Sequence, residues 1–236
     1  MSGEQIVLPD ASRLADAAAE WIAAAIAADI HERGACAVAL SGGATPRPVY
    51  ERLARPPLAH RIAWRNVTVF FGDERAVPPS DPGSNYGMVR AAMLDRVNVP
   101  PTQVHRMEAE RGDRDAAARD YERLLPKRLD LLLLGMGGDG HTASLFPGSQ
   151  VLDEQRRRVV PATAPVAPRE RLTITPPVIA AARRVAVLVA GADKAATVAR
   201  VLRGPAKPRE LPAQLALDGF WFLDAAAAAE LPGAAA

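Results

Sequence analysis

Cysteine is nearly absent from this chain of 236 residues, whose single cysteine is Cys36. One cysteine excludes an intramolecular disulfide and a metal site built from several cysteines. Because Cys36 lies within an apolar run, we expect a buried structural thiol rather than a nucleophile. No set of histidines and carboxylates has the spacing of a metal site. We therefore expect no catalytic metal and no cofactor.

Long apolar runs, a basic leader and clustered charge are also missing. No uncharged apolar run reaches about 18 residues, so no membrane span is expected. No basic region followed by an apolar core precedes the first helical stretch, which favours a cytoplasmic protein. The 29 basic and 27 acidic side chains are scattered and aromatics make up only 5%, which argues against a nucleic-acid partner. The triplet Arg156-Arg157-Arg158 is expected to be a solvated surface feature.

Short apolar runs alternate with helical stretches along the chain. The runs cover residues 36–40, 67–71, 131–134, 185–190 and 220–223. Residues 11–33 are predicted to form a helix that Asp10 caps and Gly34 ends. The alternation indicates βαβ units. We expect an α/β fold, a Rossmann-like three-layer sandwich with a mainly parallel sheet flanked by helices, in a single domain over residues 1–236; the tail 231–236 is expected to fray.

Polar loops follow four of these predicted strands, at residues 41–45, 72–75, 135–141 and 191–194. In open parallel sheets, ligands bind outside the carboxyl ends of the strands. The four loops are far apart in the sequence, yet the fold would bring them to one edge of the sheet. This convergence predicts a single active site.

The 135–141 loop, Gly-Met-Gly-Gly-Asp-Gly-His, contains the most informative residues. Its glycines, which include Gly138, allow sharp turns and close approach of the backbone to a ligand. His141 is our candidate general base, because imidazole exchanges protons near neutral pH. Asp139 would orient His141 and stabilise its cation. The alternative is a glycine-rich turn with an ordinary solvent-facing histidine.

The 41–45 loop follows a predicted strand and precedes a helical stretch that begins at Pro46. Ser41, Gly42, Gly43 and Thr45 would offer backbone amides and hydroxyls to a phosphate or a sugar hydroxyl. The loop lacks the Gly-Lys-Ser/Thr end of a Walker A motif and the glycine pattern of a dinucleotide site. A tight strand-to-helix turn explains the same residues equally simply.

Four charged residues follow two other predicted strands. Asp73 and Arg75 flank Glu74, and an arginine can bind phosphate or carboxylate through two hydrogen bonds. A local salt-bridge cluster is the alternative for this triplet. Lys194 can bind phosphate as a point charge, or can simply be a solvated residue at a helix start. Together with His141, these groups favour activation of water to attack a phosphorylated small molecule.

The chain resembles the 6-phosphogluconolactonase family. The matching segments occur in the family's order over nearly the whole chain: Leu40-Ser-Gly-Gly-Ala-Thr-Pro46, Phe71-Gly-Asp-Glu-Arg75, Ser84-Asn-Tyr86, Gly135-Met-Gly-Gly-Asp-Gly-His-Thr-Ala-Ser-Leu-Phe-Pro147, Arg171-Leu-Thr173 and Gly191-Ala-Asp-Lys194. A related enzyme, glucosamine-6-phosphate deaminase, shares the Asp-Gly-His loop. It usually has Ile-Ala-Phe-Asn after that histidine and Asp-Glu-Tyr at the acidic strand end, and both differences favour the lactonase.

The resemblance implies hydrolysis of 6-phospho-D-glucono-1,5-lactone to 6-phospho-D-gluconate in the oxidative pentose phosphate pathway. His141 would deprotonate the attacking water and Asp139 would support it. Backbone amides of residues 135–140 or a nearby cation would stabilise the oxyanion. The resemblance assigns substrate and phosphate binding to Ser41, Gly42, Gly43, Thr45, Asp73, Arg75, Gly138, Arg171 and Lys194. Arg169 is a weaker candidate than Arg171.

Two other functions fit the same residues. A sugar-phosphate isomerase or deaminase would use Asp73 as the proton-moving base, with His141 assisting ring opening. A sugar-phosphate sensor would bind without turnover, although the presence of both His141 and Asp139 argues against it. The sequence is compatible with a monomer or a homodimer, and the loop at residues 76–84 is a candidate for closure over substrate.

Overall fold

The computed structural model describes residues 3–232 and is built around a parallel sheet of six strands. The strands follow the order β1-β9-β8-β5-β2-β3, and every neighbouring pair is parallel. Their bounds are β1 Gln5–Leu8, β2 Cys36–Leu40, β3 Val67–Phe71, β5 Leu131–Gly135, β8 Arg184–Val189 and β9 Phe220–Asp224. The five strands predicted from apolar runs are all present. The sixth strand, β1, lies at the sheet edge and was not predicted from the sequence.

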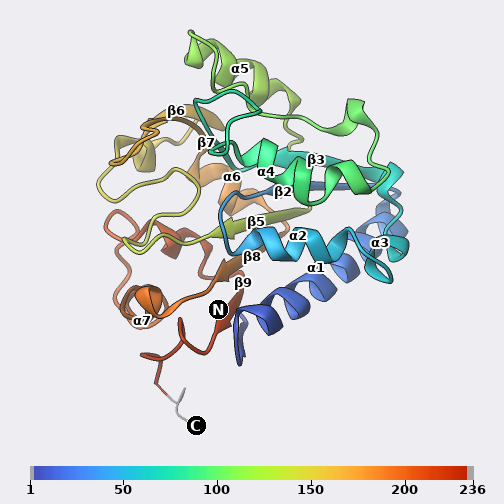
Figure 1. The fold of residues 1–236 in the computed structure, drawn as a ribbon. Helices are drawn as coiled ribbons and strands as arrows, with labels where there is room; N and C mark the ends of the chain where they lie inside the picture. Colours follow the sequence, from blue (N-terminus) through green and yellow to red (C-terminus); the bar gives the residue numbers. More distant parts are fainter. Residues whose placement is uncertain (1–2, 233–236) are drawn as a thin grey trace.

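Helices cover both faces of this sheet and form a three-layer arrangement (Figure 1). Alternate residues of β5 show why its apolar run is continuous. Leu131 and Leu133 pack into one buried cluster with the helices α1, α2 and α4, whereas Leu132 and Leu134 pack into the other with α5, α6 and α7. A strand that is buried on both faces needs apolar side chains at every position. The predicted α/β sandwich is confirmed.

The helix bounds follow local signals. They are α1 Ala11–Arg33, α2 Pro46–Leu53, α3 Leu58–Arg61, α4 Asn85–Ala92, α5 Arg114–Leu124, α6 Pro176–Ala181 and α7 Ala195–Arg203. α1 has the predicted ends, because the Asp10 carboxylate accepts a hydrogen bond from the Arg13 amide at 2.8 Å and Gly34 adopts a φ of 81°. Short 3₁₀ turns cover Trp64–Asn66, Leu94–Arg96, Pro101–Gln103, Gln150–Asp153, Ala192–Lys194 and Pro212–Ala216.

A second sheet of three antiparallel strands was not predicted. It contains β4 (Asp73–Arg75), β7 (Glu170–Ile174) and β6 (Val159–Thr163), in the order β4-β7-β6. β4 consists of three charged residues and therefore carries no apolar signal. β6 includes Pro161, which an edge strand tolerates because it has one unpaired side. This small sheet carries two arginines to the cavity described below.

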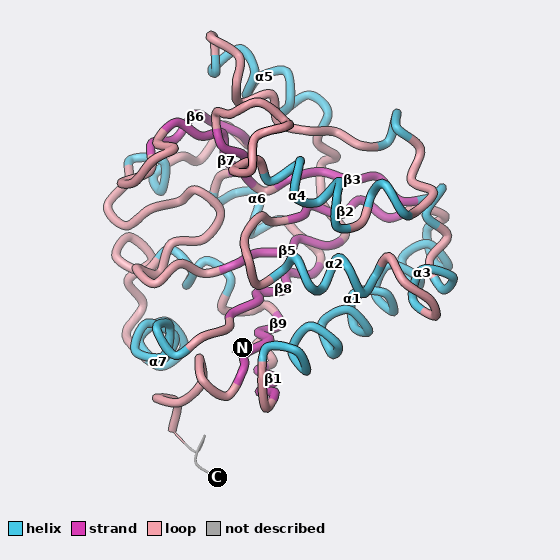
Figure 2. Tube along the Cα trace, viewed as in Figure 1, coloured by secondary structure: helices cyan, strands magenta, loops and turns pink. Residues whose placement is uncertain are grey.

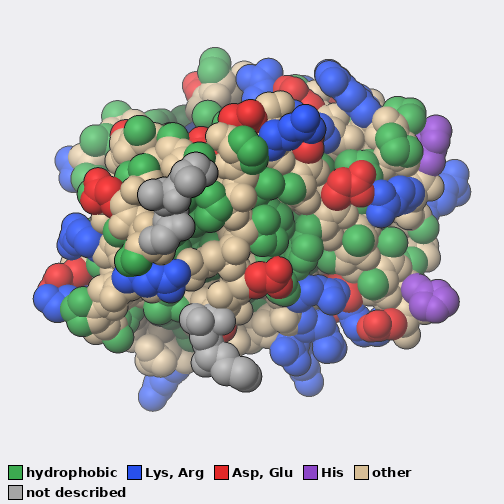
Figure 3. Space-filling model, turned by 90° about the horizontal axis from the view of Figure 1, so that it is seen from below, with side chains coloured by type: hydrophobic (Ala, Val, Ile, Leu, Met, Phe, Trp, Pro, Cys, Tyr) green, Lys and Arg blue, Asp and Glu red, His purple; other side chains and the backbone are tan. Residues whose placement is uncertain are grey.

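Charges of both signs are interspersed on the surface, as the face in Figure 3 shows. The triplet at residues 156–158 is less solvated than predicted. Arg156 is exposed, but Arg157 pairs with Glu122 at 2.8 Å, and the Arg158 guanidinium donates to the carbonyl oxygens of residues 125 and 126. These contacts fasten the end of α5 to β6. Within residues 3–232, none of the helices has the length and apolar character to cross a membrane. The prediction that residues 231–236 fray is wrong for Leu231, which is buried and whose amide donates to the Ala228 carbonyl at 2.9 Å. Residues 233–236 lie outside the described residues.

Candidate active site

The polar loops predicted to converge do meet, at the edge where β2, β5 and β8 end (Figure 2). They surround a cavity of about 660 Å³. Nine of the eleven predicted site residues line it: Ser41, Gly42, Gly43, Thr45, Asp73, Arg75, His141, Arg171 and Lys194. The other two, Asp139 and Gly138, are exposed residues next to the lining: Asp139 contacts His141, and Gly138 lies beside Lys194.

His141 and Asp139 form the hydrogen-bonded pair that the sequence predicted. The His141 Nδ1 atom lies 2.6 Å from Asp139 Oδ1, and the same oxygen accepts a hydrogen bond from the His141 amide at 3.0 Å. The hydrogen bond from the His141 side chain is the largest of the effects that lower the pKa of Asp139. Asp139 is therefore ionised at neutral pH and can only accept a hydrogen bond from His141 Nδ1, which must carry a proton. The other imidazole nitrogen, Nε2, is left for the cavity.

The imidazole of His141 is seated on the backbone of its own loop. A β-carbon on Gly137 would lie 2.1 Å from His141 Nδ1 and 2.8 Å from Asp139 Oδ1, so only glycine fits there. On another side, the Phe146 ring lies 4.7 Å from the imidazole between ring centroids. These contacts fix the ring beside the cavity, where 32% of the His141 side chain is exposed. An ordinary solvent-facing histidine would not be held in this way.

The 41–45 loop is anchored from below by a buried tyrosine. The Tyr50 hydroxyl of α2 accepts a hydrogen bond from the Ser41 amide at 3.0 Å and donates one to the Ser41 carbonyl at 2.8 Å. Gly43 turns the chain with a φ of 107°, and Pro46 begins α2. The Ser41 Oγ atom is buried and has no hydrogen-bond partner among residues 3–232. The loop is therefore both a tight turn and a polar wall of the cavity.

Residues 73–75 alternate across the strand β4. Asp73 and Arg75 line the cavity, whereas Glu74 faces the start of α4. The Glu74 carboxylate accepts hydrogen bonds from the amides of Arg75, Asn85 and Tyr86, each at 2.8 Å. Burial is the main cause that raises the pKa of Glu74. The Arg75 guanidinium donates to the carbonyl of Gly83 at 2.5 Å rather than to a neighbouring carboxylate, so the predicted salt-bridge alternative does not describe this triplet.

Two arginines face each other across the small sheet. Arg75 of β4 is in register with Arg171 of β7, and like charges in direct register destabilise a sheet. Burial, followed by the charge of Arg75, lowers the pKa of the Arg171 guanidinium. Within the described part of the chain, the Nε atoms of both residues lack hydrogen-bond partners. Arg171 is buried and Arg75 is half-buried, and a pair of cations with free donors is the arrangement that an anionic ligand would stabilise.

Lys194 approaches the cavity from the loop after β8. Its Nζ atom lies 2.8 Å from the carboxylate of Asp193 and would be 3.4 Å from a β-carbon on Gly138. The carbonyl of Gly138 accepts a hydrogen bond from the Thr197 hydroxyl at 2.6 Å, which joins the histidine loop to α7. Lys194 is thus a cation paired with Asp193 beside that loop. Among residues 3–232, no group of three or more His, Cys, Asp or Glu side chains is arranged to hold a metal ion.

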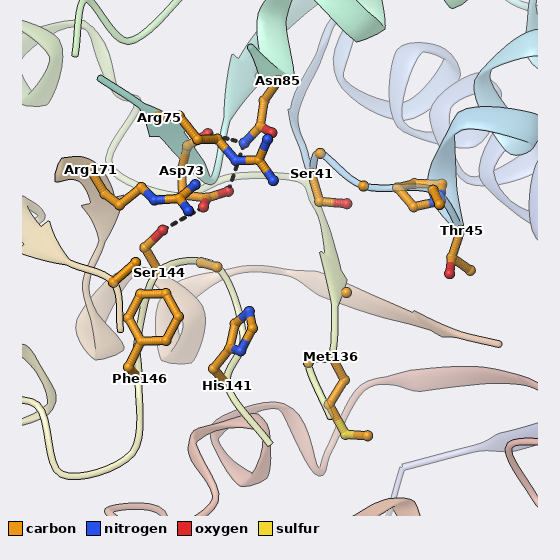
Figure 4. Close-up of a pocket in the computed structure, with 18 of the residues that line it drawn as sticks. Ser41, Thr45, Asp73, Arg75, Asn85, Met136, His141, Ser144, Phe146 and Arg171 are labelled. Atoms are coloured by element: carbon orange, nitrogen blue, oxygen red, sulfur yellow. Dashed lines mark hydrogen bonds between the residues drawn. The ribbon is translucent and has the colours of Figure 1, made fainter. Parts of the chain in front are cut away.

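Sequence reasoning assigned no role to several residues that shape the cavity. Asn85, Met136, Ser144 and Phe146 all line it, and Figure 4 shows Asn85 and Ser144 on either side of Asp73. Asn85 and Ser144 lie within the segments that carry the family resemblance, but their residue types alone gave no signal. The loop between β6 and β7 adds an apolar wall through Ala164, Val166, Ala167 and Pro168. That loop, rather than residues 76–84, borders the cavity.

Comparisons with known proteins agree with this geometry. The profile of the family described as glucosamine-6-phosphate isomerases/6-phosphogluconolactonase matches residues 9–221. A 6-phosphogluconolactonase of Nostoc sp. is 37% identical over 238 residues, which cover 95% of this chain and 97% of the relative. A 6-phosphogluconolactonase of Mycobacterium tuberculosis is 38% identical and covers 98% of this chain and 100% of its own.

The same similarity holds in three dimensions. The solved structure of 6-phosphogluconolactonase from Trypanosoma cruzi superimposes with a TM-score of 0.86 and is 29% identical. The match covers 98% of each chain. From the profile match and these relatives, the chain belongs to the family of glucosamine-6-phosphate isomerases and 6-phosphogluconolactonases.

Proposed function

We propose that this protein is a lactone hydrolase that converts 6-phospho-D-glucono-1,5-lactone to 6-phospho-D-gluconate in the oxidative pentose phosphate pathway. The observation that carries the proposal is the His141–Asp139 pair, held at 2.6 Å beside a cavity that also contains Arg75 and Arg171. A base for water and a cationic pair for a phosphorylated substrate are the two requirements of this reaction. Relatives named for this activity support it over nearly the whole chain.

His141 acts as the general base through Nε2. Because the ionised Asp139 holds the proton on Nδ1, the lone pair of Nε2 can take a proton from a water molecule in the cavity. The hydroxide that forms attacks the lactone carbonyl carbon and gives a tetrahedral intermediate. Asp139 stabilises the imidazolium that results. Collapse breaks the bond to the ring oxygen, which receives the proton from His141, and the open-chain acid is the product.

The oxyanion of the intermediate requires a donor or a cation. The amides of Gly137 and Gly140 already donate to carbonyls within their own loop, at 2.9 Å and 3.0 Å. A nearby cation is therefore the better candidate for oxyanion stabilisation than these two amides. Of Arg75, Arg171 and Lys194, those that do not stabilise the oxyanion hold the 6-phosphate together with the 41–45 loop.

The deaminase alternative requires Asp73 to move a proton. Both oxygens of the Asp73 carboxylate accept hydrogen bonds, from Ser144 Oγ at 2.6 Å and from Asn85 Nδ2 at 3.1 Å. These donors fix the orientation of the carboxylate, and each oxygen keeps a lone pair for a substrate hydroxyl. The relatives named 6-phosphogluconolactonase favour the hydrolase, and we assign Asp73 to substrate hydroxyl binding.

Hydrolysis of freshly generated 6-phosphogluconolactone tests this function, with the product read by coupling to a 6-phosphogluconate dehydrogenase. The lactone also opens unaided, so a reaction without enzyme must run in parallel. We expect a rate well above that control, and a loss of about 10²- to 10⁴-fold in His141→Ala, the range that general-base catalysis supplies. His31→Ala is the matched control, because His31 is an exposed residue of α1.

Two outcomes would contradict the proposal. A wild-type rate equal to the spontaneous rate would remove the lactonase function, and ammonia release from glucosamine 6-phosphate would then support the deaminase. Binding of 6-phosphogluconate without any turnover would support a sensor. Near-normal turnover in a folded His141→Ala variant would overturn the assignment of the base alone.

A further inference from the structure

Asp73 lines the cavity together with Arg75 and Arg171, yet within residues 3–232 it forms no ion pair with either arginine. It is 8% exposed at the cavity wall, between Arg171 and Asn85 in Figure 4. Its charge acts on Arg171, since it is one of the groups that raise the pKa of that guanidinium against the larger effect of burial. The Asp73 oxygens nevertheless accept their hydrogen bonds from two neutral side chains, Ser144 and Asn85. Something must therefore hold the carboxylate in this orientation.

Ser144 is itself fixed from two sides. Its hydroxyl donates to Asp73 Oδ2 at 2.6 Å, and its amide donates to the Thr173 hydroxyl of β7 at 3.1 Å. The preceding residue, Ala143, has a φ of 48°, a left-handed conformation that costs free energy for a residue with a β-carbon. Ser144 also lies three residues after His141. The Ser144 hydroxyl therefore connects the histidine segment to Asp73.

Asn85 holds the other oxygen of Asp73 and is equally constrained. Its Nδ2 atom donates both to Asp73 Oδ1 at 3.1 Å and to the Asp73 carbonyl at 2.9 Å. Because a carbonyl can only accept, this contact fixes which end of the amide faces Asp73. The opposite end packs on the 41–45 loop, where a β-carbon on Gly42 would lie 1.8 Å from Asn85 Oδ1. The backbone amide of Asn85 donates a hydrogen bond to the Glu74 carboxylate at 2.8 Å.

We infer that Ser144 and Asn85 are positioning residues, which hold the Asp73 carboxylate away from Arg75 and Arg171 and aim its free lone pairs at hydroxyl groups of the substrate. A carboxylate has about four lone-pair sites, and these two donors occupy two of them. Without the donors, Asp73 would turn toward Arg171, and the ion pair would reduce the positive charge available to a phosphate. These two hydrogen bonds, which we call the Asp73 clamp, thus preserve both the hydroxyl acceptor on Asp73 and the anion site at the two arginines.

This inference rests on the proposed function, because it names groups of a phosphorylated polyhydroxy substrate. A double-mutant cycle tests it, with the variants Ser144→Ala, Asp73→Ala and the double variant. We expect Ser144→Ala to lower kcat/KM about tenfold, mainly through KM, since the clamp acts on binding. In the Asp73→Ala background, the same change should have almost no further effect, because the group that Ser144 positions is gone. Asn85→Ala, alone and with Asp73→Ala, repeats the cycle on the other oxygen.

Losses that multiply in the double variants would overturn the inference, because Ser144 and Asn85 would then act independently of Asp73. Wild-type kinetics in both single variants would overturn it as well. If Ser144→Ala does not fold, the Asn85 cycle alone decides. Ser149→Ala is the control, because the Ser149 hydroxyl caps a 3₁₀ turn outside the cavity lining. Calorimetric binding of 6-phosphogluconate gives the same cycle without turnover, so failure of the hydrolase proposal remains distinguishable from failure of the clamp.

Discussion

At the scale of single residues, the site depends on where a side chain is missing. Gly137 leaves the space that the His141 imidazole occupies, since a β-carbon there would lie 2.1 Å from His141 Nδ1. We expect Gly137→Ala to displace the ring, break its hydrogen bond to Asp139 and lower kcat by about 10²-fold, a loss within the range attributed to general-base catalysis. The measurement is steady-state hydrolysis of the lactone, with circular dichroism to establish folding.

The control for this substitution is Gly112→Ala. A β-carbon on Gly112 meets no atom within 4 Å, and Gly112 does not line the cavity. We expect that variant to keep the wild-type rate. Equal activity of Gly137→Ala and Gly112→Ala would show that the seat of His141 does not matter for turnover.

At the scale of elements, Glu74 joins β4 to the start of α4. Burial raises the pKa of Glu74 in the folded protein, so near its ordinary pKa the folded state keeps a proton that the unfolded chain has already lost. The stabilisation from this proton is complete below the ordinary pKa and is lost as the pH rises through the raised value. We therefore expect the free energy of unfolding of the wild type, relative to Glu74→Gln, to fall as the pH rises from the ordinary carboxyl pKa of about 4.3 through neutrality.

Urea unfolding of both proteins over that range measures the difference. Near neutral pH the comparison contains a second contribution, because glutamine replaces one of two accepting oxygens with an amide donor that faces Ser84 Oγ and a backbone amide. That contribution does not change with pH. A difference in unfolding free energy that stays constant with pH would contradict the assigned cause.

The elements also show what the sequence could and could not predict. β5 and α1 were predictable, because a fully buried strand needs an unbroken apolar run, and because Asp10 and Gly34 mark the ends of the helix. β4 was not, since its three residues are charged and its pairing with β7 is a tertiary contact between distant segments. For the same reason the sequence indicated that Arg75 and Arg171 belong to one site, but not that they stand in direct register.

The site shows the same division. His141 and Asp139 were predictable because they lie two residues apart in a glycine-rich loop that follows a strand. Ser144 and Asn85 were missed because a serine and an asparagine are common surface residues, and the positioning role that we propose for them depends on contact with Asp73, which is distant in the sequence. Chemistry carried by adjacent residues can be recognised in a sequence, whereas the residues that orient it come from the fold.

At the scale of the whole molecule, the two ends of the parallel sheet carry different kinds of polar groups. The cavity lies at the carboxyl ends of the strands, whereas a buried ionic network lies at the amino ends. There the fully buried carboxylate of Asp29 pairs with Arg33 and Arg184 and accepts a hydrogen bond from the Cys36 thiol. Burial is the main cause that raises the pKa of this thiol, so Cys36 stays protonated and unreactive, as its apolar context predicted.

This separation predicts that stability can be changed without changing the chemistry. Asp29→Ala removes a fully buried carboxylate from two partly exposed arginines, which should lower the free energy of unfolding by more than the loss of an exposed ion pair does. On the same helix, Glu20 pairs with Arg61 at 2.5 Å on the exposed surface, and Glu20→Ala should cost only about 0–1 kcal/mol. Both variants should keep the wild-type kcat/KM at temperatures where they are folded. If Asp29→Ala lowered kcat/KM while fully folded, the amino ends of the strands would be coupled to the site, and the division of the sheet into a stabilising edge and a reactive edge would be wrong.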